Sequence, residues 1–226
     1  GLTGIDWVLE HEADVEMIGD LIYSKATTGR VRWVLAVPGD SDITSVEDCA
    51  GKRISTELVG FTRRYFAERN IPVDVEFSWG ATEGKVVEGL VDAIVEVTET
   101  GSTIRAHGLK IVDELLQSNT KIIANPEACR DACQKTKISQ LSTLPHGALT
   151  AAHMVGLKMN VPADRLDRVI EQLPSITSPT ISELSRSDWF SVEIVVAENE
   201  VREIIPVLIE GGVVGIIEYP LNKVVD

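Results

Sequence analysis

The stretch VDAIVEVTETGSTI, residues 91–104, joins an alternating apolar run to a loop of hydroxyls and glycine. The alternation over residues 91–97 predicts a β-strand. The following loop, Thr100–Thr103, offers backbone N–H groups and three hydroxyls, and Gly101 lets the backbone approach a ligand closely. A short helical turn beginning near Ser102 would direct its positive end toward the same anion. The stretch therefore predicts a phosphate-binding loop at the carboxyl end of a strand.

Glu96 stands four residues before this loop. A carboxylate beside a phosphate is repelled unless the two groups are offset along the ligand. We therefore expect Glu96 to accept hydrogen bonds from ribose hydroxyls or to contact a bound Mg²⁺. A sugar phosphate would satisfy both halves of the stretch. The same pattern is also typical of an ordinary tight turn between a strand and a helix, so the stretch alone leaves both interpretations open.

The composition indicates a folded, strongly acidic protein. The chain has 226 residues, is 44% hydrophobic and carries a formal net charge of −14. Such a chain is repelled by nucleic-acid backbones and by anionic membrane surfaces, so we expect neither as a partner. Its cysteines are odd in number and form no paired framework, which favours a reducing, cytoplasmic location. No apolar run approaches the roughly 18 residues of a membrane span.

The chain contains three successive regions with different residue patterns. From residue 31 to about residue 124, short β-rich and helical runs alternate and predict an α/β sheet with helices on its faces. Residues 126–153 contain few β-branched residues, and we expect them to be mainly helical with a break near Pro145. The remaining chain reads as βαββαβ, which predicts a separate ferredoxin-like domain.

Both helices of this last unit show apolar residues at i, i+3, i+4 and i+7. The residues that define the two faces are Leu166, Val169, Ile170 and Leu173, and then Val201, Ile204, Ile205 and Leu208. Pro206 lies inside the second helix, which we expect it to weaken or kink. Each pattern predicts one buried helical face.

Long stretches of the chain resemble ATP phosphoribosyltransferase of the long, self-regulated form, the first enzyme of histidine biosynthesis. The stretches are GLTGIDWV (1–8), GKRISTELVGFTRRYFAERN (51–70), VEFSWGATEGKVVEGLVDAIVEVTETGSTIRAHGL (75–109), SPTISEL (178–184) and WFSVEIVVAENEVREIIPVLIEGGVVGIIEYPLNKVV (189–225). The family's signature spacing is matched by Glu83, Gly89, Asp92, Ile94, Glu96 and residues 100–103. This spacing is more specific than a lone glycine-rich loop.

The resemblance implies a two-lobed α/β catalytic part, similar to type II periplasmic binding proteins, followed by the ferredoxin-like regulatory domain. Residues 1–32 and 126–153 would form part of catalytic domain I, residues 33–125 domain II, and residues 154–226 the regulatory domain. In the family, a further amino-terminal portion precedes the GLTGIDWV stretch. We therefore expect the cleft of this chain to lack that portion, and its catalytic competence is left open.

The implied reaction transfers the phosphoribosyl group of phosphoribosyl pyrophosphate to N1 of ATP and releases pyrophosphate, with Mg²⁺ required. N1 is already nucleophilic, so the protein has chiefly to position two polyanions and stabilise the charge that separates as pyrophosphate leaves. Histidine would be the feedback inhibitor. The resemblance also implies homo-oligomers, dimers that assemble into a hexamer, in the cytoplasm.

The resemblance assigns roles residue by residue. Glu96 would be the catalytic residue that holds the ribose hydroxyls, although many members have Asp there. The substrate-binding residues would be Thr100, Gly101, Ser102, Thr103 and Glu83. The effector-binding residues would be Asn160, Ile176, Ser178, Thr180, Val195 and Gly215.

Several alternatives stay open. Glu83 and Ser78 could line the substrate site, or the segment SWGATE could be an ordinary strand-to-helix turn. Arg63 or Arg64 could face substrate phosphates, but a solvated helix face is favoured. We predict no protein metal site, because the nearest candidate set lacks zinc spacing; that set is Cys129, Cys133, His146 and His153. A two-lobed solute-binding protein and a truncated, non-catalytic amino-acid-binding fragment remain alternative functions.

Overall fold

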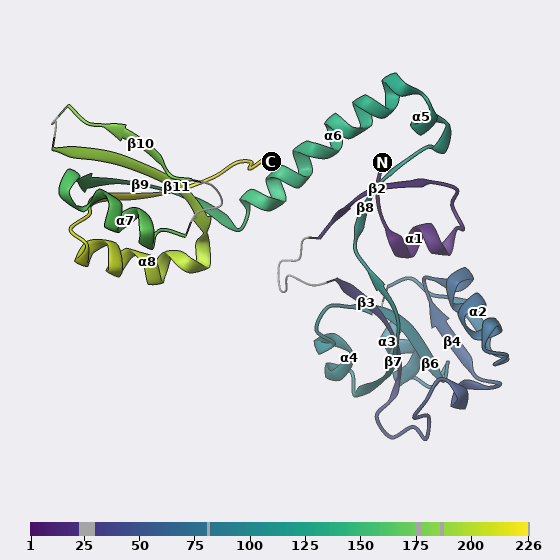
Figure 1. Cartoon of the computed structure of the whole chain (residues 1–226). Coiled ribbons are helices and arrows are strands. Elements are labelled where there is room, and N and C mark those ends of the chain that lie inside the picture. Colours follow the sequence, from purple (N-terminus) through teal and green to yellow (C-terminus); the bar gives the residue numbers. More distant parts are fainter. Residues whose placement is uncertain (23–29, 81, 175–177, 186–187, 226) are drawn as a thin grey trace. The chain divides into compact units, whose positions relative to one another are not determined.

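The computed structural model describes residues 1–22, 30–80, 82–174, 178–185 and 188–225. These residues form sheets of three, five and four strands. They divide into two compact units, residues 1–142 and 143–226 (Figure 1). Among them, no helix is long and apolar enough to cross a membrane.

The five-stranded sheet has the order β5-β4-β6-β3-β7. Its strands are β3 (Val31–Pro38), β4 (Arg53–Thr56), β5 (Asp74–Phe77), β6 (Ala93–Thr98) and β7 (Leu109–Ser118). Strands β5, β4 and β6 are parallel, whereas β3 runs antiparallel to both β6 and β7. The carboxyl ends of the parallel strands therefore share one edge with the beginning of β3.

Both faces of this sheet are buried. On one face, Leu35 and Val95 pack with Phe66 of helix α2 (Val59–Glu68). On the other, Ile94 packs with Val86 of α3 (Thr82–Val87) and Ile104 of α4 (Ser102–Ala106). The central strands are continuous apolar runs for this reason. A 3₁₀ turn, Glu47–Cys49, precedes β4.

The three-stranded sheet lies at the other end of this unit and is antiparallel in the order β1-β8-β2. It consists of β1 (Leu2–Gly4), β2 (Glu16–Leu21) and β8 (Thr120–Ala124), with helix α1 (Ile5–Glu10) between β1 and β2. The chain passes between the two sheets twice, once between β2 and β3 and once at Asn119. The predicted two-lobed α/β part is confirmed.

Helices α1 and α2 join the two lobes side by side (Figure 1). The Glu10 carboxylate accepts hydrogen bonds from the backbone N–H groups of Gly60 and Phe61, each at 2.8 Å, so it caps the first turn of α2. In return, Arg64 of α2 donates to the carbonyl of Leu9 at the end of α1 and lies 3.5 Å from the Glu12 carboxylate. Each helix end is thus satisfied by the other lobe.

Arg63 is exposed and Arg64 is partly exposed, as expected for a solvated helix face, and both guanidinium groups also contact backbone carbonyls. Arg64 makes the contact with α1 described above, and Arg63 donates to the carbonyl of Val75 at 2.7 Å. Their donors satisfy carbonyl groups at the end of α1 and on β5.

The predicted break near Pro145 is wrong. Helix α6 (Ala132–Ala151) continues through Pro145, and the interruption lies at Asp131, after α5 (Pro126–Arg130). Asp131 is extended, with φ −77° and ψ 120°, and its side chain accepts a hydrogen bond from the N–H of Gln134 at 2.8 Å. A capping aspartate therefore starts a new helix there, whereas the proline removes only one donor from a long helix.

The second unit is a four-stranded antiparallel sheet of order β10-β11-β9-β12. Its strands are β9 (Met154–Pro162), β10 (Thr180–Glu183), β11 (Trp189–Ala197) and β12 (Val214–Pro220). Helix α7 (Leu166–Gln172), preceded by a 3₁₀ turn (Ala163–Arg165), follows β9, and helix α8 (Glu198–Glu210) follows β11. The predicted ferredoxin-like βαββαβ unit is confirmed.

One face of this sheet packs on both helices. Leu157 and Ile194 are buried with Val169 of α7 and Leu208 of α8, as the helical periodicity predicts. Helix α8 continues through Pro206. The pleat turns alternate residues of β9 and β11 to the opposite face.

That opposite face holds a cross-strand contact that depends on a glycine. The Tyr219 ring of β12 lies over Gly156 of β9, where an added Cβ would come within 2.2 Å of the ring. From there the Tyr219 hydroxyl reaches the Glu193 carboxylate on β11, to which it donates a hydrogen bond. This bond is the first cause of the raised pKa of Tyr219.

Candidate active site

The predicted phosphate-binding loop lies where β6 ends and α4 begins. Gly101 adopts the left-handed conformation, with φ +73°, which favours glycine at this position. The first intrahelical bond of α4 runs from Arg105 N to Gly101 O at 3.1 Å. The N–H groups of residues 102–104 precede that bond; that of Ser102 donates to the Thr100 hydroxyl at 3.3 Å, and the next two point out of the helix end. The loop therefore presents donors at the carboxyl edge of the parallel strands.

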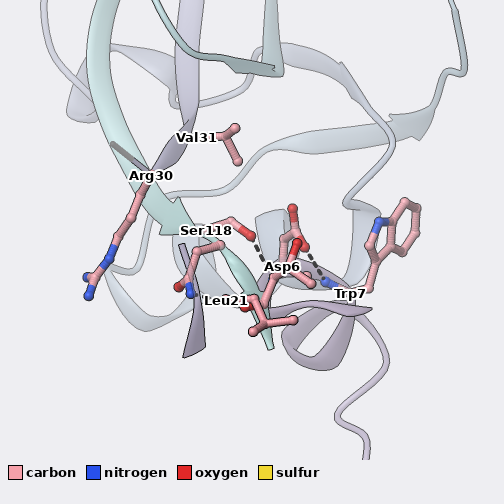
Figure 2. Close-up of a pocket in the computed structure, with 9 residues that line it drawn as sticks. Asp6, Trp7, Leu21, Arg30, Val31 and Ser118 are labelled. Carbon is pink, nitrogen blue, oxygen red and sulfur yellow. Dashed lines mark hydrogen bonds between the residues drawn. The ribbon is translucent and has the colours of Figure 1, made fainter. Parts of the chain in front are cut away.

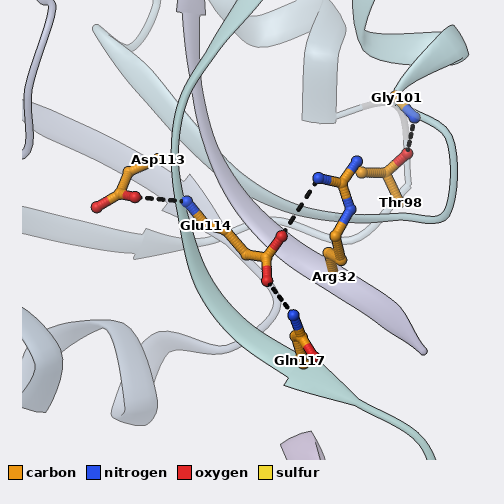
Figure 3. Close-up of polar contacts among 6 residues, drawn as sticks. All are labelled: Arg32, Thr98, Gly101, Asp113, Glu114 and Gln117. Carbon is orange, nitrogen blue, oxygen red and sulfur yellow. Dashed lines mark hydrogen bonds and ion pairs between the residues drawn. The ribbon is translucent and has the colours of Figure 1, made fainter. Parts of the chain in front are cut away.

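Hydrogen bonds within the chain fix the shape of this loop. The Gly101 N–H donates to the Thr98 hydroxyl at 2.8 Å (Figure 3). The Thr100 hydroxyl contacts that of Ser102 at 3.0 Å. Arg105 donates to the Thr100 carbonyl at 3.0 Å, which places a cation on the loop itself. Sequence reasoning missed Arg105, because its spacing matched no motif that we considered.

Glu96 lies on β6, partly buried, two residues before the strand ends. Burial raises the pKa of its carboxyl group, and the negative charges of Glu83 and Glu57 raise it further. The N–H of Val97 donates to it at 3.1 Å and opposes this rise. A carboxylate in such surroundings is short of donors. Hydroxyl groups of a ligand would supply them.

Thr82 adds a donor beside Glu96. Its hydroxyl is buried and has no hydrogen-bond partner among the described residues. It lies close enough to Glu96 to lower the pKa of that carboxyl slightly against the net rise. A buried hydroxyl without a partner is unfavourable, so a ligand oxygen or a shifted Glu96 would satisfy it. In the sequence, Thr82 stood out only as part of the SWGATE segment.

The structure brings some of the predicted substrate residues together and separates others from them. Glu83, in the first turn of α3, is near enough to Glu96 for their charges to interact. Ser78 is buried, and its N–H donates to the carbonyl of Thr56 at 3.0 Å. Asp92 accepts a hydrogen bond from the N–H of Arg53 at 2.8 Å, so its role is structural. The candidate site thus comprises Glu96, Glu83, Thr82 and residues 100–103.

A cavity of about 200 Å³ lies elsewhere, where the chain passes between the two lobes (Figure 2). Asp6 lines it and is buried, and its carboxylate accepts a hydrogen bond from the Trp33 indole at 2.7 Å. Its backbone N–H donates to the Ser118 hydroxyl at 3.4 Å. The carboxylate is therefore engaged in joining α1 to β3, and the cavity contains none of the predicted site residues.

The predicted effector residues are spread over the second unit. Asn160 and Gly215 lie together, since a Cβ on Gly215 would be 3.2 Å from the Asn160 amide nitrogen. Thr180 pairs with Glu193, and Val195 pairs with Gly156, nearer the other end of β11. Ser178 is exposed, and Ile176 lies outside the described residues. Among these residues, Asn160 and Gly215 are neighbours.

Metal-binding side chains are not clustered in the part of the chain that the structure describes. No group of three or more His, Cys, Asp and Glu side chains there is arranged to hold a metal ion. This includes the set of Cys129, Cys133, His146 and His153.

Two protein-family models match the chain. The model of ATP phosphoribosyltransferase matches residues 1–144, and the model of the HisG C-terminal domain matches residues 151–223. The chain belongs to the ATP phosphoribosyltransferase family. The two matches agree with the long form that the sequence resembles, because the second covers the ferredoxin-like unit.

Relatives named ATP phosphoribosyltransferase are similar over almost the whole chain. The relative from Desulfatibacillum aliphaticivorans is 58% identical, over 99% of this chain and 77% of its own length. That from Nitratidesulfovibrio vulgaris is 59% identical, over 100% of this chain and 77% of its own. A solved ATP phosphoribosyl transferase (HisG:HisZ) complex from Thermotoga maritima is 29% identical, with a TM-score of 0.53, over 63% of this chain and 66% of that chain.

Proposed function

We propose that this ATP phosphoribosyltransferase family member transfers the phosphoribosyl group of phosphoribosyl pyrophosphate to N1 of ATP and releases pyrophosphate, the first step of histidine biosynthesis. The observation that carries the proposal is the 58% identity to a relative of that name over 99% of the chain. The loop and carboxylate at the end of β6 support it.

Residues 100–103 would hold the 5-phosphate through N–H and hydroxyl donors, while Glu96 accepts hydrogen bonds from the ribose hydroxyls. Glu83 would contribute a second carboxylate on the α3 side. No covalent intermediate is needed, because ATP N1 attacks the ribose carbon directly as its bond to pyrophosphate breaks. The protein lowers the barrier by holding the two reactants in line and by fixing the sugar.

Mg²⁺ is proposed as the metal of this reaction. It commonly keeps several waters and is held by one or two carboxylates together with substrate phosphates, so a protein cage is not required. Glu96 and Glu83 fit such a set, because the charge of Glu83 acts on Glu96. When bound, Mg²⁺ offsets the negative charge of the leaving pyrophosphate.

Calorimetry and turnover test this function. We expect phosphoribosyl pyrophosphate to bind the chain in the presence of Mg²⁺, and we expect the absorbance of the phosphoribosylated nucleotide to appear when ATP is added. A solute-binding protein would bind neither compound in this way. Absence of phosphoribosyl pyrophosphate binding would contradict the proposal.

We also propose that the second unit binds histidine as a feedback inhibitor, in a cytoplasmic homo-oligomer. The match to the HisG C-terminal domain model supports this role. The contacts would come from Asn160, Ser178, Thr180, Val195 and Gly215, with Ile176 as a further candidate. Inhibition requires that histidine bind one conformational state more tightly than another. Histidine titration of the wild type and of Asn160→Ala tests the site; equal affinity in both would remove Asn160 from it.

A further inference from the structure

Arg32 lies at the beginning of β3, on the same edge of the sheet as the candidate site. In the register of β3 and β6, Arg32 is opposite Thr98 and Val34 is opposite Glu96. Opposite residues share a face, and residues two apart on a strand share it as well. Arg32 and Glu96 are therefore diagonal neighbours on one face, at Cβ separations of about 7–8 Å that an arginine side chain can span.

The face they share is the one that carries the phosphate-binding loop. Val34 packs on this side with Val86 of α3 and Ile104 of α4. Helix α4 contacts β7, so the loop that precedes it is directed toward the β3 and β7 side of the sheet, beyond Thr98. Figure 3 shows the Arg32 side chain beside Thr98, whose hydroxyl accepts the hydrogen bond from Gly101.

Binding a phosphate at this site requires a positively charged side chain that is not already engaged in holding the loop. The chain has a net charge of −14, and the negative charges of Glu83 and Glu57 both act on Glu96. The loop donors are neutral. Arg105 already contacts the Thr100 carbonyl and maintains the shape of the loop. A phosphate dianion in these surroundings would be bound weakly without a further positive charge.

Arg32 is available because its present partner is easily exchanged. Its guanidinium lies 3.2 Å from the Glu114 carboxylate, and the two side chains are 33% and 31% exposed. Exposed or half-exposed pairs of this kind contribute little to stability. The other Glu114 oxygen accepts a hydrogen bond from the Gln117 amide at 2.7 Å, so Glu114 keeps a donor when Arg32 leaves (Figure 3).

We propose that Arg32 is a substrate-binding residue whose guanidinium exchanges the Glu114 carboxylate for the 5-phosphate of phosphoribosyl pyrophosphate. The inference rests on the proposed function and adds to it the group that recognises the phosphate charge. An arginine suits this task, because its planar fork makes two parallel hydrogen bonds to a phosphate. Glu114 then acts as a competitor that holds Arg32 in place before the substrate arrives.

Two variants that break the same ion pair test this proposal. Arg32→Gln removes the guanidinium that binds the phosphate. We expect calorimetry to show about 10- to 100-fold weaker binding of phosphoribosyl pyrophosphate. Glu114→Gln removes the competitor, and we expect unchanged or several-fold tighter binding. Arg32→Lys keeps the charge without the fork and should fall between wild type and Arg32→Gln. If the pair is only structural, the two glutamine variants weaken binding alike.

Shorter ligands identify the end of the substrate that Arg32 contacts. Arg32→Gln should weaken the binding of ribose 5-phosphate as much as that of the full substrate and leave pyrophosphate binding unchanged. A loss confined to pyrophosphate overturns the assignment. A wild-type chain that binds none of these ligands overturns the proposed function and this inference together. Wild-type binding with equal losses in the two glutamine variants overturns this inference alone.

Discussion

The five-stranded and four-stranded sheets bury their strands in different ways. Helices cover both faces of the first, so a ligand can meet it only at the strand ends, where β6 runs into residues 100–103. Helices α7 and α8 pack with one face of the second, and its other face carries partly or fully exposed side chains such as Lys158 and Glu193. The candidate active site therefore lies at an edge of its sheet, whereas the candidate effector site is predicted on a second sheet that has one open face.

The largest effect should come from Glu96→Gln, which tests the edge. We expect kcat/KM for phosphoribosyl pyrophosphate to fall about 10- to 100-fold, because a neutral amide accepts weaker hydrogen bonds from the ribose hydroxyls. Steady-state kinetics measures this loss, with Glu88→Gln, an exposed position after α3, as the control. An unchanged kcat/KM would remove Glu96 from the site.

The same variant should gain stability at neutral pH. Burial raises the pKa of Glu96 in the folded chain, so its ionised form opposes folding. This cost is absent below the pKa of an unfolded glutamate and develops as the pH rises through the folded pKa. We therefore expect Glu96→Gln to raise the urea midpoint at neutral pH and to match wild type in acid. Equal midpoints at both pH values would contradict this account.

Next in size is Gly156→Ala, which tests the open face. The added Cβ would overlap the Tyr219 ring, and overpacking of this kind costs about 1–3 kcal/mol. Hydrogen exchange should rise over residues 154–220, while affinity for phosphoribosyl pyrophosphate stays at the wild-type value. The double variant Gly156→Ala with Tyr219→Ala removes the overlap and should recover most of the protection. A loss of substrate affinity would show that the two regions are not independent.

Gly101→Ala tests the edge through the backbone alone. A residue with a Cβ at φ +73° costs about 1–2 kcal/mol, and here that Cβ would also meet Arg105 and Ile111 at 2.9 and 3.0 Å. We expect about tenfold weaker binding of phosphoribosyl pyrophosphate by calorimetry. Gly89→Ala is the matched control: Gly89 has φ +71° and nothing within 4 Å of the added Cβ. It should lose similar stability but no affinity; equal affinity losses would contradict a role for the loop.

The smallest effect is a shift in pH dependence caused by Glu83→Gln. The charge of Glu83 raises the pKa of Glu96, so its removal lowers that pKa. Because Glu96 must be ionised to hold the ribose, the acid limb of kcat/KM should move to lower pH. The position of the limb, not its height, is the measurement. If the acid limb stays at the same pH, the charge of Glu83 does not affect the pKa of Glu96.

The sequence predicted the local parts of this molecule better than the contacts between distant parts. The β6 strand, the loop and the helical faces of α7 and α8 follow from short-range patterns, and the structure has them. The roles of Arg32 and Thr82 do not follow from such patterns, because Arg32 is brought to the site by the pairing of β3 with β6, and Thr82 by the placement of α3 beside β6. The break predicted at Pro145 was wrong because the prediction considered the proline alone and not the long helix around it. That helix begins after Asp131, whose side chain caps it. The domain boundaries and the roles of the site residues stay predictions.

The clasp between α1 and α2 has a consequence for how this protein can vary. The first amides of α2 depend on Glu10, and the last carbonyls of α1 depend on Arg64, so each lobe carries half of a shared arrangement. Arg64 also pairs with the Glu12 side chain, so positions 12 and 64 should change in concert as sequences diverge. A recombination that replaced one lobe with that of a distant relative would separate the two partners, and only an exchange that moved both helices together would preserve them.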